Sequence, residues 1–226
     1  MVALGRVEGP ADPRDANYPM QLVLAAVSTM PTSRYWYPGK VVLNQGNLGA
    51  CVGFTGANWM QNSPTRTLVD NQVGFDLYAE CKKIDGIPNI EGTYARVLLE
   101  ILRAQGRVKR YLWANNAADL KAWVLSTGPV LVGTTWRQDM FHPDAAGFIH
   151  PTGNIVGGHE YLVRGYSRPL AAYRCRNSWG STWGIGNNAW AGNGGEFWIS
   201  EADLNSLIWG GGGNWGDAVG VEEAKL

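Results

Sequence analysis

Three separated segments of this 226-residue chain carry side chains that could together perform nucleophilic acyl transfer. The first runs from Asn44 to Phe54 and contains Gln45, a glycine-rich turn and Cys51. A thiol at the start of a helix lies at the positive end of the helix dipole, which favours the reactive thiolate. Attack on a carbonyl builds negative charge on its oxygen, and the side-chain amide of Gln45 could return across the turn to stabilise that charge.

The second and third segments contain a histidine and an asparagine. His159 lies in the apolar run Gly157–Tyr166, which we interpret as a strand, and Asn177 lies in the Trp- and Gly-rich run Cys175–Gly184. A Cys, a His and an Asn far apart in sequence suit a site in which the imidazole ionises the thiol and the amide orients the imidazole. Taken singly, each residue has a plainer interpretation, as a small core thiol, a core histidine or a turn asparagine. The occurrence of all three together favours a catalytic site over these plainer interpretations.

Together these segments resemble papain-like cysteine peptidases of a compact, disulfide-poor prokaryotic or viral type. The resemblance extends from about residue 36 to about residue 200, and its most specific part is the pattern Asn-Ser-Trp-Gly-x-x-Trp-Gly that begins at Asn177. It implies a two-lobed α+β fold, with a helical lobe, an antiparallel barrel-like sheet and an active cleft between them. It also assigns roles to four residues: Cys51 as nucleophile, His159 as its base and acid, Asn177 as the orienting residue, and Gln45 as the oxyanion donor.

The resemblance further implies residues that would bind an extended substrate. Gly92 and Gly158 would contact its backbone, because the lack of a side chain permits close approach. Gly133 and Glu160 fall on the walls of the pocket for the second substrate residue. A wide pocket with a carboxylate would favour Arg or Lys two residues before the scissile bond, unless strand alternation turns Glu160 toward a structural partner. Trp179 would cover the His–Asn hydrogen bond and exclude water from it, although it could also be simply a core residue.

The amino-acid composition limits the kinds of molecule that we expect the protein to bind. The chain has 19 basic and 19 acidic residues, so neither nucleic acid nor a charged membrane is indicated as a partner. We expect a peptide or protein substrate and no cofactor, and the sequence does not indicate an oligomeric state. A metal pair of His142 and His150 is disfavoured, because no Cys or acidic residue has matching ligand spacing and the segment is typical of a loop. No apolar run approaches the roughly 20 residues of a membrane span.

The cysteine residues and the N-terminal sequence indicate the cellular compartment in which we expect the protein. Leu48 stands where secreted members of the family usually have a disulfide cysteine, so a reducing compartment fits better. Cys81 and Cys175 are expected to be buried free thiols. The first ten residues lack the apolar core of a signal peptide, and we therefore expect a cytoplasmic protein. The first forty residues are too few and too Pro-rich for the family's pro-region, so the chain is either active as made or cut from something longer.

The resemblance implies one papain-like catalytic domain over residues 1–226. An extended N-terminal arm covers residues 1–41, the helical lobe about 42–112 and the β lobe about 113–226. Expected helices cover residues 51–61, 75–83, 94–105, 119–125 and 201–208. Expected strands cover residues 41–43, 130–134, 161–166, 171–176, 196–200 and 217–221.

The expected activity is hydrolysis of peptide bonds through a thioester. Two alternatives remain open at this stage. A related thiol enzyme could cut or join another amide, such as a peptidoglycan cross-link. The chain could instead be a binding module that kept the fold and lost the activity, although retaining all four of the proposed active-site residues argues against that. The arm or the Gly-rich tail could supply self-inhibition if either covers the cleft.

Overall fold

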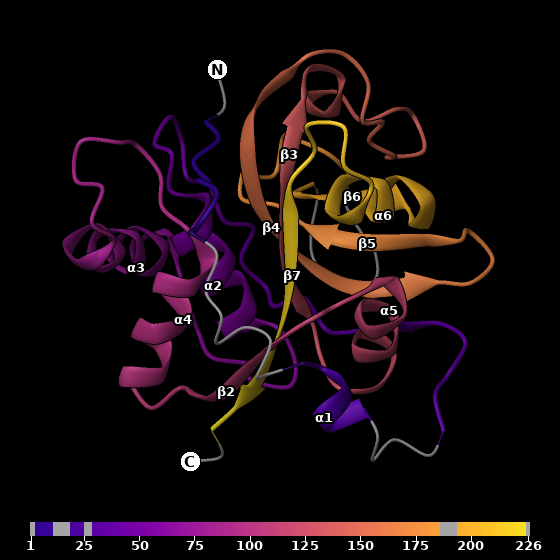
Figure 1. The fold of residues 1–226 in the computed structure, drawn as a ribbon, viewed down its shortest axis with the longest axis horizontal. Helices are drawn as coiled ribbons and strands as arrows, with labels where there is room; N and C mark the ends of the chain where they lie inside the picture. Colours follow the sequence, from indigo (N-terminus) through magenta and orange to yellow (C-terminus); the bar gives the residue numbers. More distant parts are fainter. Residues whose placement is uncertain (1–2, 11–18, 25–28, 186–193, 225–226) are drawn as a thin grey trace.

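The computed structural model describes residues 3–10, 19–24, 29–185 and 194–224 (Figure 1). Its α-helices are α1 Gln21–Leu24, α2 Cys51–Gln61, α3 Asn71–Ile84, α4 Ala95–Ala104, α5 Ala117–Ser126 and α6 Glu201–Trp209, and a 3₁₀ helix, η2, covers Gln138–Phe141. Its strands are β1 Arg34–Tyr35, β2 Val108–Trp113, β3 Val130–Arg137, β4 Ile155–Ser167, β5 Ala172–Arg176, β6 Glu196–Ser200 and β7 Gly216–Glu223. The α+β class is thereby confirmed.

The strands form one seven-stranded sheet in the order β2-β7-β3-β4-β5-β6, with β1 paired to β4. Every strand pairing in it is antiparallel. The described strands do not close on themselves, so the sheet is open rather than barrel-like. Helices α2, α3 and α4 lie on one side of the molecule, and α5 and α6 lie on the other side of the sheet (Figure 1).

Two hydrophobic clusters hold these layers together. Alternation along the strands divides the side chains: Leu131, Leu162 and Val219 join the cluster of helices α2–α4, whereas Val132, Tyr161 and Ala218 join the cluster of α5 and α6. Successive side chains of a strand point to opposite faces of a sheet, so a single sheet serves both cores.

Helix α2 runs through the centre of the molecule. All its residues from Cys51 to Gln61 are buried, as expected for a helix covered on every side. It ends at Gln61, and the next residue, Asn62, has an extended backbone and donates from its side chain to the carbonyl of Asn58 at 2.7 Å. The predicted boundaries of this helix are confirmed, and they put Cys51 at the first helical position.

Other boundaries differ from the prediction for local reasons. The Asp70 side chain accepts from the backbone N–H of Val73 and caps α3, so this helix begins four residues before the apolar stripe at Phe75. In the same way, Asn116 caps α5, which therefore begins at Ala117. Capping side chains satisfy backbone N–H groups that the first turn leaves free.

Three further elements were missed or misjudged. Strand β2 was not predicted, and it pairs with β7 at the edge of the sheet. Residues 41–43 are not a strand; instead Asn44 forms an isolated bridge with Trp179. The arm is not wholly extended, because it contains the short helix α1, and its β1 pairs with β4.

Candidate active site

Cys51 begins α2 and its thiol is fully buried against β4. Burial raises the pKa of this thiol to about 12, and the charge of Glu160 adds to the effect. The backbone N–H groups of Glu160 and Val52 and the guanidinium of Arg6 act in the opposite direction without overcoming it. Since Glu160 follows His159 directly, these contacts place the thiol beside the strand that carries the histidine.

His159 and Asn177 come from β4 and from the residue after β5. The Nε2 atom of His159 lies 2.8 Å from Oδ1 of Asn177, and the backbone N–H of Ser178 donates to the same Oδ1 at 2.8 Å. A carbonyl oxygen only accepts, so Nε2 carries the imidazole proton and Nδ1 has the free lone pair. That Nδ1 is buried with no hydrogen-bond partner among the described residues. Burial lowers the pKa of His159 to about 4, although the hydrogen bond that it donates to Asn177 acts in the opposite direction, so the ring is neutral in this conformation.

Aromatic rings enclose the histidine. The Trp179 ring lies 4.5 Å from the imidazole centroid at a tilt of 31°, and the Trp136 ring meets it edge-on at 4.8 Å. This packing excludes water from the His159–Asn177 bond and strengthens it. Trp136 was not singled out from the sequence, because it lies on β3 and its contact with His159 depends on the pairing of two strands.

Hydrogen bonds fix both the oxygen and the nitrogen of the Gln45 side-chain amide. Its Oε1 accepts from Oγ of Ser178 at 2.6 Å, which leaves Nε2 to donate to the carbonyls of Leu48 at 2.9 Å and Ala3 at 3.1 Å. Ser178 therefore contacts both Asn177 and Gln45. Sequence reasoning missed it, although it directly follows Asn177 in the motif.

A segment of the chain itself lies across these residues. Residues Ala3–Val7, which we call the cleft segment, enter between the helices and β4 (indigo in Figure 1). Gly158 accepts from the backbone N–H of Gly5 at 3.2 Å and of Arg6 at 3.0 Å. Thr93 donates its N–H to Gly5 at 3.0 Å and accepts from Val7 at 2.8 Å. The indole N–H of Trp179 donates to the Ala3 carbonyl at 3.0 Å, so the cleft already holds an extended peptide.

Three glycines make room for the cleft segment. A Cβ on Gly133 would lie 1.7 Å from Nε of Arg6, and one on Gly158 would lie 2.5 Å from the Arg6 carbonyl oxygen. Gly92 has φ +100°, and a Cβ there would lie 2.3 Å from the Gly5 carbonyl oxygen. Each contact is shorter than real Cβ atoms show, so any larger residue would displace the peptide. Next to Gly92, the hydrogen bonds to the backbone of the cleft segment are made by Thr93 and not by Gly92 itself.

Arg6 fills a pocket whose acids are Glu160 and Asp217, which we call the carboxylate pocket. Its Nη2 lies 2.6 Å from Oδ2 of Asp217, and its Nε lies 2.9 Å from Oε2 of Glu160. The second contact is an ion pair with poor hydrogen-bond alignment, since both Glu160 oxygens lack hydrogen-bond partners. Burial raises the pKa of Glu160, and the charge of Asp217 adds to this effect, whereas the guanidinium of Arg6 opposes it and favours the ionised carboxylate. The guanidinium also lies 4.5 Å from the centroid of the Trp215 ring.

The remaining candidate residues lie elsewhere. Nε2 of His150 contacts Oδ2 of Asp144 at 3.0 Å, and no group of three or more metal-binding side chains occurs in the described part of the chain. Cys81 and Cys175 are free and buried, which confirms the prediction for both. No helix in the described ranges has the length and apolar character needed to cross a membrane.

Comparison of the sequence with known proteins points to one family. The profile described as "Papain family cysteine protease" matches residues 99–192, a stretch that contains His159 and Asn177. "Cathepsin B-like cysteine proteinase 3" of Ostertagia ostertagi is 24% identical over 111 residues, which are 47% of this chain and 64% of that protein. The "Gut-specific cysteine proteinase" of Caenorhabditis elegans is 28% identical over 79 residues, 34% of this chain and 24% of that protein. The alignments thus span less than two thirds of either relative.

Solved structures extend the similarity to nearly the whole chain. Xylellain, a cysteine protease from Xylella fastidiosa, superposes with a TM-score of 0.72 at 19% identity, covering 99% of this chain and 97% of that one. A proCathepsin B from Trypanosoma congolense has a TM-score of 0.64 at 11% identity, with 99% and 87% coverage. The Carica candamarcensis cysteine protease CMS1MS2, solved in complex with E-64, has a TM-score of 0.57 at 15% identity, with 87% and 100% coverage.

The class of protein follows from these findings. The chain has the papain-like fold over nearly its full length, and part of its sequence matches the papain family. The resemblance to papain-like cysteine peptidases is therefore confirmed.

Proposed function

We propose that this protein is a papain-like cysteine peptidase that hydrolyses peptide bonds through a thioester on Cys51. The observation that carries the proposal is the extended peptide already held in the cleft. The cleft segment hydrogen-bonds to Gly158, to Thr93 and to Gln45, beside the buried Cys51 and His159. A cleft that satisfies the backbone of an extended peptide at the nucleophile suits peptide bonds as substrates.

The mechanism follows from the protonation of His159. Because the proton on Nε2 is donated in a hydrogen bond to Asn177, the lone pair of Nδ1 is the one able to accept the proton of the Cys51 thiol. The thiolate then attacks the substrate carbonyl, and the Nε2–H of Gln45 donates to the developing oxyanion. The protonated imidazole gives its proton to the departing amine, and water hydrolyses the thioester with His159 as base. The thiolate–imidazolium pair expected from the sequence remains part of this proposal.

The conformation described here is a closed form of the enzyme. Cys51 and His159 are completely buried in this form, and burial raises the pKa of the thiol to about 12 and lowers the pKa of His159 to about 4. Both groups are then neutral, which opposes nucleophilic attack. Departure of Ala3–Val7 would admit water and substrate and release the carbonyl of Ala3 from Gln45. The hydrogen bonds of the cleft segment support the proposal that it supplies the self-inhibition considered from the sequence.

The carboxylate pocket gives the specificity. Gly133 leaves space that a long side chain fills, and Glu160 and Asp217 provide two carboxylates for it. The ion pair of Glu160 with Arg6, which enters this space, supports a role for Glu160 in the pocket. Once Arg6 leaves, the buried carboxylate of Glu160 needs a cation to offset its desolvation. We propose that substrates place Arg or Lys two residues before the scissile bond.

The test is cleavage of two fluorogenic peptides that differ only in Arg or Leu at that position. It uses the Arg6→Ala variant, which should open the cleft, with Cys51→Ala as the inactive control. We expect hydrolysis of the Arg peptide, lower kcat/KM for the Leu peptide and no turnover with Cys51→Ala. An aliphatic preference would overturn the pocket assignment alone. Turnover of peptidoglycan fragments but not of peptides would favour the other amide chemistry, and no turnover of either would favour a binding module.

A further inference from the structure

A second cavity lies away from the active-site cleft and is rich in arginine. It has a volume of about 660 Å³ and is lined by Arg34, Arg66 and Arg164 together with the aromatic residues Tyr35, Trp36 and Tyr37. This volume is in the range of small-molecule sites. Arg164 follows His159 by five residues on β4, about 17 Å along an extended strand, so the cavity does not share the catalytic residues.

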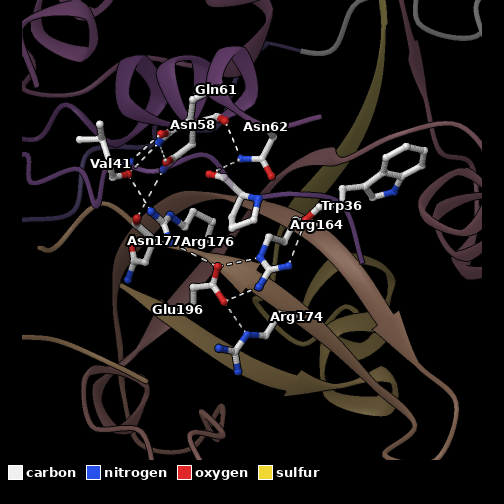
Figure 2. A network of polar contacts seen from close by, with 11 residues as sticks. Trp36, Val41, Asn58, Gln61, Asn62, Arg164, Arg174, Arg176, Asn177 and Glu196 are labelled. Atoms are coloured by element: carbon white, nitrogen blue, oxygen red, sulfur yellow. Dashed lines mark hydrogen bonds and ion pairs between the residues drawn. The ribbon is translucent and has the colours of Figure 1, made fainter. Parts of the chain in front are cut away.

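Arg164, which lines the cavity, belongs to a buried cluster with excess positive charge. Figure 2 shows Glu196 at the centre of three buried arginines, Arg164, Arg174 and Arg176. Burial would raise the pKa of Glu196, but these guanidiniums outweigh it and hold the pKa below its ordinary value. One carboxylate therefore balances three cations. Since Glu196 and the Trp36 carbonyl accept from only three of the five N–H groups of Arg164, this residue retains donor capacity.

The rim adds two more cations without adding an acid. The guanidinium of Arg34 lies 4.0 Å from the centroid of the Trp36 ring, and that of Arg66 lies 5.6 Å from the centroid of the Tyr37 ring. Arg34 also donates to the carbonyl of Leu125 at 3.2 Å. In the described ranges neither guanidinium pairs with a carboxylate, and no described residue lining the cavity is acidic. Stacking on a ring orients a guanidinium while leaving its N–H edge free for an anion.

The backbone conformation of Arg66 also supports a role for this cavity in binding an anion. It has φ +56°, a left-handed conformation that non-glycine residues rarely adopt and that persists where the surroundings impose it. This conformation holds an exposed arginine at the mouth of a positively charged cavity.

We propose that the cavity lined by Arg34, Arg66 and Arg164 binds a small molecule that carries a phosphate or pyrophosphate group. Several guanidiniums with one nearby carboxylate call for a multiply charged anion, and the guanidinium fork matches phosphate oxygens. The site is independent of the proposed peptidase activity, so either assignment can fail without the other.

Isothermal titration calorimetry with inorganic pyrophosphate tests the proposal on the full chain. We expect saturable binding that weakens as NaCl is added, because the contacts are ionic. Arg66→Gln removes one charge-assisted contact from an exposed residue and should raise Kd about tenfold or more. Arg103→Gln, at an exposed position on α4, is the matched control and should bind as the wild type does.

Three results would overturn the proposal. They are the absence of saturable heat with pyrophosphate, equal affinity in Arg66→Gln and the wild type, and equally tight binding of succinate, a dianion without a phosphate group. Arg34→Gln provides a second variant among the arginines that line the cavity, and its circular dichroism spectrum checks that the fold is intact.

Discussion

We predict that replacing Arg6 shifts the protein toward the open form of the cleft. Replacing it with alanine removes the contacts with Glu160 and Asp217, which are 2.9 and 2.6 Å long. The Arg6 and Glu160 side chains are 3% and 0% exposed, whereas Asp217 is 26% exposed. Breaking a buried ion pair costs about 3–5 kcal/mol, and the partial exposure of Asp217 argues for the lower end. A loss of about 3 kcal/mol moves the closed–open equilibrium about a hundredfold toward the open form.

The assay is the rate of Cys51 alkylation by iodoacetamide, with the modified residue identified by mass spectrometry. If only the open form reacts, Arg6→Ala should react up to about a hundredfold faster than the wild type, reaching a ceiling when the open form predominates. Arg6→Lys keeps the positive charge but loses the forked guanidinium, so its alkylation rate should fall between those of the wild type and Arg6→Ala. Arg107→Ala, at an exposed position outside the cleft, should match the wild type.

Equal alkylation rates for Arg6→Ala and the wild type would refute the reasoning, because Arg6 would then not hold the cleft closed. Cys81 and Cys175 are buried and free, so they report unfolding in the same experiment. Acceleration at all three cysteines would show unfolding instead of opening. Deleting residues 1–7 would then separate the two, since it removes the peptide without leaving a truncated side chain in the pocket.

Three further predictions concern Asn177, Glu160 and His159. Asn177→Ala removes the 2.8 Å bond to His159 and should lower kcat about a hundredfold through misplacement of the imidazole, with little change in KM; an unaltered kcat would contradict the orienting role. In the opened Arg6→Ala background, Glu160→Gln should lower kcat/KM for the Arg peptide by about 10- to 100-fold and leave the Leu peptide unchanged, whereas an equal loss for both peptides would argue against a specificity role. The pKa of His159 is about 4 in the fold and 6.5 ordinarily, so the unfolded chain binds the extra proton between these values. The stability contributed by neutral His159 is complete above pH 6.5, and about 3 kcal/mol is lost as the pH falls to 4. Urea unfolding at pH 7.5 and 4.5 should show a smaller loss for His159→Gln, and the same loss in both proteins would contradict this account.

Local signals in the sequence predicted many of the elements that position the site. The limits of α2 follow from a helical run that ends before Asn62 and Pro64, and the structure agrees at both ends. Strand β6 was also predicted with its observed limits. Errors arose where a neighbour in space decides the element. Strand β2 depends on its pairing with β7, more than a hundred residues away in sequence, and no local pattern reports that partner.

The roles of individual residues divide in the same way. Cys51, His159 and Asn177 could be selected from residue type, spacing and motif, and the 2.8 Å contact of His159 with Asn177 agrees with that selection. Arg6 and Asp217 could not be selected, because they are separated by 211 residues and meet only when the cleft forms. The hydrogen bond from Ser178 to Gln45, across 133 residues, is a similar case.

The sequence by itself therefore determined the chemical groups of this protein and the helix and strands that carry them, since capping, periodicity and turn residues act over a few positions. Only the tertiary structure decided that a segment of the chain occupies the cleft, that Arg6 enters the pocket of Glu160 and Asp217, and that Cys51 and His159, the proposed catalytic groups, are neutral there. These features arise from burial and from contacts between distant segments. Both require the packed fold, because desolvation and ion pairing depend on what surrounds a group in space.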